Sequence, residues 1–286
     1  MGVHSGKHGQ INGVSTMRRW TLTDTLKHAM AVASNTLQGV ARKAGVRDWS
    51  GSYTAFGASP VSMALPGQEF AFVGYGAPTN DVSGNGLRYE GNAVAKSLAI
   101  VWNWKTQEII SHTVQFEGDL ELSIVTAGAD PGDAVVPDVP SPGGTKIDWA
   151  LNNSGSFSTL PNLTQATLTI TQAVVSYVNS STYIAGQTWT GKKSGAPLDW
   201  TLAIQQEDTD RATTVWDPGD VLDLKLFTDA SLFWRLKFGL AGDFSGITVD
   251  RQTGAIIGRT LNVAMNAYYG SSAGQILLPG GTQLWP

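Results

Sequence analysis

Hydrophobic and polar residues alternate along much of the chain with a period of two, the pattern of a half-buried β-strand. The clearest case is Thr106–Leu122, in which one polar residue, Gln115, separates Val114 from Phe116. The same pattern predicts further strands, at Val14–Thr25, Asp48–Phe56, Phe70–Tyr75, Ala93–Trp104, Ala166–Val178, Trp200–Gln205, Val221–Phe227, Leu232–Phe238 and Gly246–Val249. The sequence therefore predicts an all-β protein.

One segment fits two structures. Leu26–Lys43 carries apolar residues at helical spacing and is followed by Gly45, where a helix could end. An extended excursion from the neighbouring strands fits the segment as well. We expect an all-β fold with a minor helix, and the choice between helix and hairpin at 26–43 stays open.

The strongest strand pattern occurs twice. Thr106–Leu122 aligns without a gap with Thr253–Tyr269, at an offset of 147 residues. Two other pairs keep the same order: Val46–Trp49 resembles Pro197–Trp200 at an offset of 151, and Pro66-Gly67 with its apolar run resembles Pro218-Gly219 at 152. Ordered self-similarity of this kind indicates an internal duplication.

The duplication predicts two tandem β-sandwich domains, 1–126 and 147–286, on either side of a linker at 127–146. The linker region is rich in proline and glycine and has no core pattern. We expect Met1–Gly13 to be a flexible arm and Asn179–Pro197 to be a polar loop. The tail from Gly270 carries apolar residues at 276–278 and at Trp285, for which we expect a neighbouring subunit as the contact.

Composition excludes several classes of function. The chain has 286 residues, 42% hydrophobic and 15% charged, which is enough to bury a large core. It has no run of 18 apolar residues, and its first residues lack the apolar centre of a signal peptide, so we expect no membrane association. The net charge of −4 provides no basic field for nucleic acid, and with no cysteine there is no disulfide or thiolate metal site.

Candidate chemistry is sparse. The four histidines, His4, His8, His28 and His112, do not have metal-ligand spacing, and His112 aligns with Arg259, which favours a solvent-facing strand position. The segment 186–194 lacks the Gly-Lys-Ser/Thr end of a phosphate-binding loop, and the acidic run 207–210 reads better as a solvated turn than as a calcium loop. We therefore expect no catalytic, cofactor or metal residues, and a protein that is not an enzyme.

The ten tryptophans allow two interpretations. Trp102 and Trp104 lie on one face of a strand, as in carbohydrate-binding sandwiches that hold sugars on exposed aromatic side chains. Trp49 and Trp200 recur at equivalent places in the two copies, which favours a structural role. The predicted core anchors are Trp20, Trp49, Phe116, Trp200 and Val263.

Three segments in order, Lys7–Trp20, Gly45–Tyr53 and Tyr89–Leu122, resemble the successive signatures of bacteriophage tail tube (major tail) proteins. The resemblance implies a β-sandwich with a flanking helix, whose subunits close into stacked rings that conduct DNA without catalysis. Six-membered rings are implied for single-domain members, so a chain with two such domains would form a pseudo-hexameric ring from three copies.

The resemblance also implies a setting and contacts. The protein would assemble in the host cytoplasm into the virion tail, with tape measure, terminator and baseplate or hub proteins as partners, no cofactor and no membrane; phage DNA would pass without specific binding. The segments Thr25–Gly45 and Ser181–Gly195 would reach the adjacent ring. The candidate contact residues there are Thr25, Lys27, His28, Asn35, Lys43, Ser181, Lys192 and Lys193. A hub, terminator or secretion-tube protein of the same fold and a carbohydrate-binding module remain as alternatives.

Overall fold

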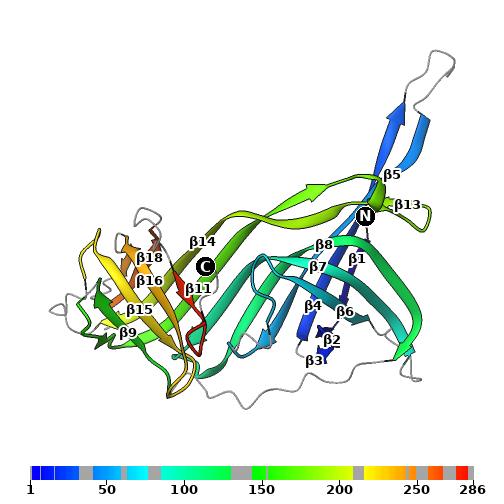
Figure 1. Cartoon of the computed structure of the whole chain (residues 1–286). Coiled ribbons are helices and arrows are strands. Elements are labelled where there is room, and N and C mark those ends of the chain that lie inside the picture. The colour runs from blue at the N-terminus through cyan, green and yellow to red at the C-terminus, as the bar shows by residue number, and fades with distance from the viewer. Residues whose placement is uncertain are drawn as a thin grey trace.

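The computed structural model describes residues 2–6, 8–15, 17–31, 41–58, 63–76, 85–129, 144–152, 154–208, 216–242, 245–248, 257–266 and 275–282. We refer to residues 2–129 as the first half and to residues 144–282 as the second half. Figure 1 shows them as two β bodies side by side, with long strands passing from one to the other.

The described chain is almost entirely β-structure. The strands of the first half are β1 (Gly2–Gly6), β2 (His8–Ile11), β3 (Val14–Ser15), β4 (Met17–Ala31), β5 (Ala41–Phe56), β6 (Glu69–Gly76), β7 (Asn85–Asn103) and β8 (Glu108–Ala129). Those of the second half are β9 (Ile147–Leu151), β10 (Ser158–Thr159), β11 (Leu163–Tyr177), β12 (Tyr183–Ile184), β13 (Gln187–Trp189), β14 (Gly191–Asp208), β15 (Val221–Phe227), β16 (Phe233–Ala241), β17 (Ser245–Thr248), β18 (Ile257–Met265) and β19 (Ile276–Leu277). Among the described residues the helical structure is confined to 3-10 conformation at Gly144 and at the short turn η3 (Ser180–Thr182), so the all-β prediction is confirmed.

The two halves have the same strand order. In the first half antiparallel neighbours follow the order β4-β5-β8-β7-β6-β2. In the second half they follow β11-β14-β18-β16-β15-β9, also antiparallel throughout. Corresponding strands come in the same order along the chain. The sheet of the first half also closes on itself, because β1, which precedes β2, pairs with β4.

The sheets of the halves are continuous. The carboxyl-terminal part of β7 pairs with β8 on one side and with β11 on the other, with Ser97 opposite Thr171 and Asn103 opposite Gln165. The order β4-β5-β8-β7-β11-β14-β18-β17 therefore forms one eight-stranded antiparallel sheet across both halves.

In each half the first two strands of the sheet order given above, β4 and β5 or β11 and β14, form a long hairpin. The β4–β5 hairpin projects beyond the body of the molecule, whereas the β11–β14 hairpin lies over the first half (Figure 1). We call the part of the second hairpin from Gln172 to Leu198 the second arm. Its tip carries η3, β12 and β13, and β13 pairs in parallel with β5.

Each half has an aromatic core on the inner side of its folded sheet, as in a β-sandwich. In the first half Phe72 of β6 contacts Trp20 and Trp49 of the opposite strands, with ring centroids 5.8 and 6.1 Å apart. The five predicted core anchors, Trp20, Trp49, Phe116, Trp200 and Val263, are all at most 2% exposed. Two of them, Trp49 and Trp200, occupy corresponding positions on β5 and β14.

Several segments differ from the expectation. Met1–Gly13 is not a flexible arm where it is described, because Gly2–Gly6 is a strand paired with β4 and His8–Ile11 is a strand paired with β6. Asn179–Pro197 is not a loop but the tip and return strand of the second arm. The strand β8 runs on to Ala129, past the predicted start of the linker, and residues 130–143 lie outside the described chain.

The other differences concern the ambiguous segment and the tail. The described ends of the segment 26–43 are antiparallel strands, with Leu26 opposite Arg47 and Ala31 opposite Ala41. These ends therefore have the hairpin structure and not the helical one; residues 32–40 are not described. In the tail Ile276 is 2% exposed and pairs with Leu236 of the same chain, so it needs no neighbouring subunit, and Trp285 is not described.

Candidate assembly interface

The most extensive contact between the described residues of the two halves is the pairing of β7 with β11. On the core side of the sheet Leu98, Ile100 and Trp102 of β7 lie opposite Ile170, Leu168 and Ala166 of β11. All six are at most 1% exposed. Burial of this much apolar surface makes the pairing a continuation of the core.

Side chains of the two halves also exchange hydrogen bonds around this pairing. The indole N–H of Trp102 donates to the carbonyl oxygen of Phe227 at 3.0 Å, and that of Trp234 donates to the carbonyl oxygen of Ala58 at 3.0 Å. Buried indole N–H groups need such acceptors. The two halves are thus joined in one defined arrangement.

The register reveals a repeat that the sequence comparison missed. Through their pairing with β5 and β14, residues 21–25 of β4 (TLTDT) occupy the place of residues 167–171 of β11 (TLTIT), at an offset of 146. The signal was present as four identities in five residues. It was overlooked because only the strands after it were aligned.

The outer face of the shared sheet is polar but uncharged over its middle. One row runs Thr54, Thr113, Ala99, Thr169, Thr201 and Ala264, and the next runs Ser111, Val101, Thr167, Ala203 and Asn262, each residue opposite the next on the neighbouring strand. These side chains are half-buried or exposed. Thr54 and Thr113 are joined through their hydroxyl groups at 3.1 Å. We call these two rows the neutral face.

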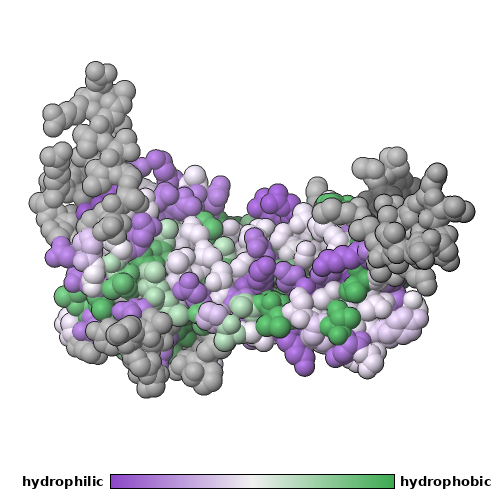
Figure 2. Space-filling view, turned by 90° about the horizontal axis from the view of Figure 1, so that it is seen from above, coloured by the Kyte–Doolittle hydropathy of each residue, from purple (hydrophilic) through white to green (hydrophobic). Residues whose placement is uncertain are grey.

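Charged side chains stand at the ends of the neutral face. Asp199 and Glu117 lie beyond one end, and Glu207, paired with Lys105 at 2.7 Å, lies beyond the other. Seen from above, strongly hydrophobic residues form separate patches among hydrophilic and intermediate ones (Figure 2).

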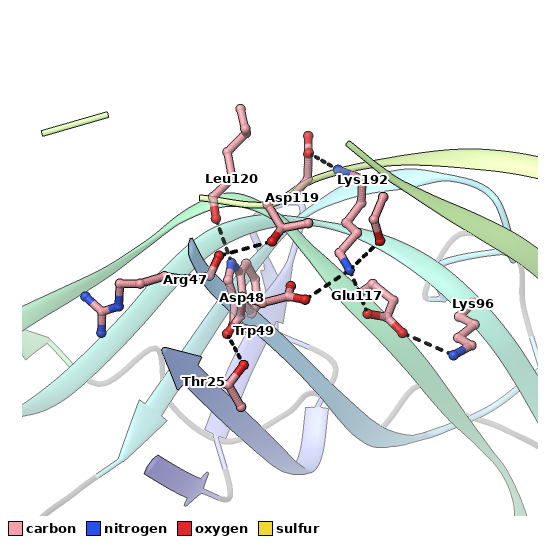
Figure 3. A network of polar contacts seen from close by, with 11 residues as sticks. Thr25, Arg47, Asp48, Trp49, Lys96, Glu117, Asp119, Leu120 and Lys192 are labelled. Carbon is pink, nitrogen blue, oxygen red and sulfur yellow. Dashed lines mark hydrogen bonds and ion pairs between the residues drawn. The ribbon is translucent and has the colours of Figure 1, made fainter. Parts of the chain in front are cut away.

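The second arm is fixed to the first half by a buried lysine. The ammonium group of Lys192 lies 3.3 Å from a carboxylate oxygen of Asp48 on β5 and 3.2 Å from one of Glu117 on β8. It also donates to the hydroxyl group of Ser176 at 3.0 Å, and the backbone N–H of Lys192 donates to Asp119 at 2.6 Å (Figure 3). The Lys192 side chain is 5% exposed, so the paired charges are largely removed from water.

The Glu117 carboxylate is adapted to this environment. Burial alone would raise its pKa, but hydrogen bonds and charges from Lys96 and Lys192 outweigh burial and hold the pKa below its usual value. Glu117 therefore stays ionised at neutral pH and supplies the charge that Lys192 requires.

Backbone hydrogen bonds complete the contact. Thr190 donates its N–H to the carbonyl oxygen of Arg47 at 2.9 Å and accepts from the N–H of Leu120 at 3.0 Å. The indole of Trp49 donates to the carbonyl oxygen of Leu120 at 3.0 Å. The neighbouring Gly118 leaves room for this indole, since a Cβ there would lie 2.0 Å from the ring. The arm is thus hydrogen-bonded to the backbone near Trp49 and to Leu120, the residue that accepts the hydrogen bond of the Trp49 indole.

The predicted ring-contact residues have different environments. Thr25 donates to the carbonyl oxygen of Asp48, and Lys27, His28, Ser181 and Lys193 are exposed. Lys43 lies on β5 with its side chain outside the described part, and Asn35 is not described. Lys192 differs from the expectation, because its ammonium group is enclosed within its own chain.

His112 also differs from the expectation. It is 1% exposed, on the core side of β8 opposite Ala55 and Ile100, and not in solvent. Its Nδ1–H donates to the carbonyl oxygen of Gly57 at 2.8 Å. Burial lowers the pKa of His112 to about 4, although the hydrogen bond to Gly57 opposes this, so the ring is neutral at pH 7.

The tryptophan pair considered for sugar binding does not belong to the exposed residues. Trp102 is buried and Trp104 is half-buried, with its N–H bonded to Thr145, so neither presents an open ring to a sugar. No group of three His, Cys, Asp or Glu side chains with metal-binding geometry occurs in the described part. Nor does that part contain a helix long and apolar enough to span a membrane.

Comparison of the sequence with models of protein families and with curated proteins gives no match.

Proposed function

We propose that the protein is a structural subunit with a tandem duplication, of the tail tube type, that assembles from three copies into stacked rings around a channel for DNA. The observation that carries the proposal is the contact of β7 with β11. It joins two equivalent halves through different edges, so it is a head-to-tail contact. A contact of this kind leaves one unused edge at each end of the sheet and either closes into a ring or continues as a helix.

One end of the eight-stranded sheet supports this, whereas at the other end β4 is paired with β1. At the first of these ends β17 pairs with β18 and, within the described residues, with no other strand. Its backbone corresponds to the part of β7 that pairs with β11, since β17 faces the same positions of β18 as β7 faces on β8. Open strand edges carry unpaired N–H and C=O groups that favour pairing with another chain. Repeating the internal contact between copies would satisfy them.

The neutral face supports a passage for DNA. Phosphate binding depends on lysine and arginine, and the two rows contain neither. A channel lined by hydroxyl, amide and small side chains would let a polyanion slide without being held. The acidic residues beyond one end, Asp199 and Glu117, would add no attraction.

Electron microscopy of the purified protein in negative stain tests the proposal. We expect rings or tubes with an axial hole and three copies per ring. Rings that do not stack would favour a hub or terminator role for the same fold. A protein that remains monomeric at high concentration, with or without DNA, would contradict the proposal.

A further inference from the structure

Strand β1 occupies, on the first half, the edge that joins the halves on the second. It pairs with β4 from Gly2 opposite Asp24 to Gly6 opposite Trp20. In the shared register Trp20 corresponds to Ala166 and Asp24 to Ile170 of β11. These positions lie within the stretch of β11 that pairs with β7. The edge of β4 is therefore the counterpart of an interface, and β1 covers it.

The side chains of β1 differ in kind from those of β7 at the corresponding positions. Where β7 places Leu98, Ile100 and Trp102 against the core, β1 places Gly2, His4 and Gly6 in the corresponding row. Its one large apolar residue, Val3, is 71% exposed. The pairing of β1 therefore buries much less apolar surface than the pairing of β7.

Within the described part of the chain, His4 makes the side-chain hydrogen bond and the ring contact of β1. His4 Nδ1 lies 2.9 Å from the Tyr89 hydroxyl group, and the two rings lie 4.7 Å apart. The core below does not depend on β1 alone, because the Trp20 indole N–H donates to the carbonyl oxygen of His8 on β2, at 2.8 Å. Removal of β1 would thus expose the edge of β4 and leave Trp20 anchored.

We propose that the β4 edge is the docking surface for β17 of a second copy, and that β1 is a displaceable cover that must leave before the copies join. The inference rests on the proposed assembly and adds the step that controls it. By the internal register, Ser245 of β17 corresponds to Ala99 of β7, which lies opposite Thr169, the counterpart of Thr23. Ser245 of one copy would therefore lie opposite Thr23 of the next.

A disulfide lock tests the cover. The chain has no cysteine, so Val3→Cys with Thr23→Cys introduces the sole pair, at opposite residues of β1 and β4. We expect the oxidised protein to stay monomeric and the reduced protein to assemble like the wild type, as followed by light scattering. The control is Val221→Cys with Leu240→Cys, opposite residues of β15 and β16, which should assemble in both states.

A second variant loosens β1. A Cβ at Gly6 would lie 2.1 Å from the Tyr75 carbonyl oxygen and 2.7 Å from the Trp20 ring, so Gly6→Val should expel the strand. We expect assembly to accelerate about tenfold, which corresponds to about 1.4 kcal/mol. The control is Gly144→Val, where a Cβ meets no atom within 4 Å.

The outcomes separate the two proposals. If the oxidised lock assembles as fast as its reduced form, β1 is not a cover and the inference is overturned, while the ring proposal stands. If the wild type, the reduced lock and the Gly144→Val variant all fail to assemble, the ring proposal fails and the inference falls with it.

Discussion

Lys192 and Lys193 are adjacent in sequence, yet their environments differ in every respect that matters for stability. Lys192 is enclosed by Asp48, Glu117 and Ser176, whereas Lys193 is exposed, with its ammonium group 5.5 Å from the centre of the Tyr177 ring. Alternation along β14 sends the two side chains to opposite faces. The pair therefore provides a substitution and its own control.

We expect Lys192→Met to reduce the free energy of unfolding by about 2–3 kcal/mol, because the partly buried Asp48 carboxylate loses its ion pair with Lys192 and Glu117, of its two described ion pairs, keeps only the one with Lys96. Chemical denaturation measures this. Lys193→Met should change the stability by less than about 0.5 kcal/mol. Equal losses in the two variants would show that the enclosed ion pairs do not fix the arm.

His112 makes stability depend on pH. Its pKa is 6.5 in model peptides and about 4 in the folded chain, so between these values the unfolded chain binds more protons. The contribution of His112 to the free energy of unfolding is fully present above pH 6.5. It falls by up to about 3 kcal/mol as the pH decreases towards 4. His112→Asn, whose amide can replace Nδ1–H towards Gly57, should remove this part of the slope. An unchanged difference in unfolding free energy between pH 7.5 and 5.5 would contradict the assignment.

At the scale of the elements, the second arm is predicted to stabilise the first half. Replacing 178–190 by Asn-Gly would close β11 and β14 as a tight hairpin, since Tyr177 lies opposite Gly191. The change removes the bonds of Thr190 and Gln187 to β5. We expect amide exchange at Val46–Asp48 to accelerate at least about tenfold, equivalent to about 1.4 kcal/mol. Amides of β15, far along the sheet from the arm, serve as the internal control and should not change.

Much of the fold could be predicted from the alternation of apolar and polar residues, because a strand with one buried face shows this alternation in its sequence. Nearly every predicted strand has its counterpart, from Asp48–Phe56 in β5 to Val221–Phe227 in β15. The return strand of the second arm escaped prediction, because no continuous core covers either of its faces and its sequence shows no alternation. The outgoing strand of the arm is the end of the predicted strand Ala166–Val178. Gly2–Gly6 has no strand pattern in its sequence, because it begins and ends with glycine, and Gly6 fits where Trp20 and Tyr75 leave no room for a side chain.

The candidate interface was less predictable than the strands. The sequence predicts Lys192 as a contact to the adjacent ring, whereas its carboxylate partners lie in its own chain, 144 and 75 residues away in sequence. His112 looked polar because it aligned with Arg259, but a single substitution within a core row is invisible to an alignment of two copies. The neutral face depends on register between strands that are distant in sequence, which no local pattern encodes.

For the whole molecule, the neutral face predicts how assembled tubes treat DNA. Thr113→Lys with Thr169→Lys would place two cations in the same row of the sheet, separated by Ala99. Tubes of this variant should bind DNA with an affinity that falls steeply with salt, whereas wild-type tubes should not retain it. Ala230→Lys with Ser156→Lys, both at exposed positions outside the strands, is the control of equal charge. Equal retention by both variants would place the neutral face outside the channel.

The most direct test of the head-to-tail ring is a covalent one. Thr23→Cys with Ser245→Cys would place one cysteine on the β4 edge and one on the β17 edge of a chain that has no other. After assembly and oxidation, denaturing electrophoresis should show a closed species of three copies that reduction returns to single chains. Single chains alone after oxidation of the assembled protein, or an unlimited ladder in place of a closed trimer, would contradict the account.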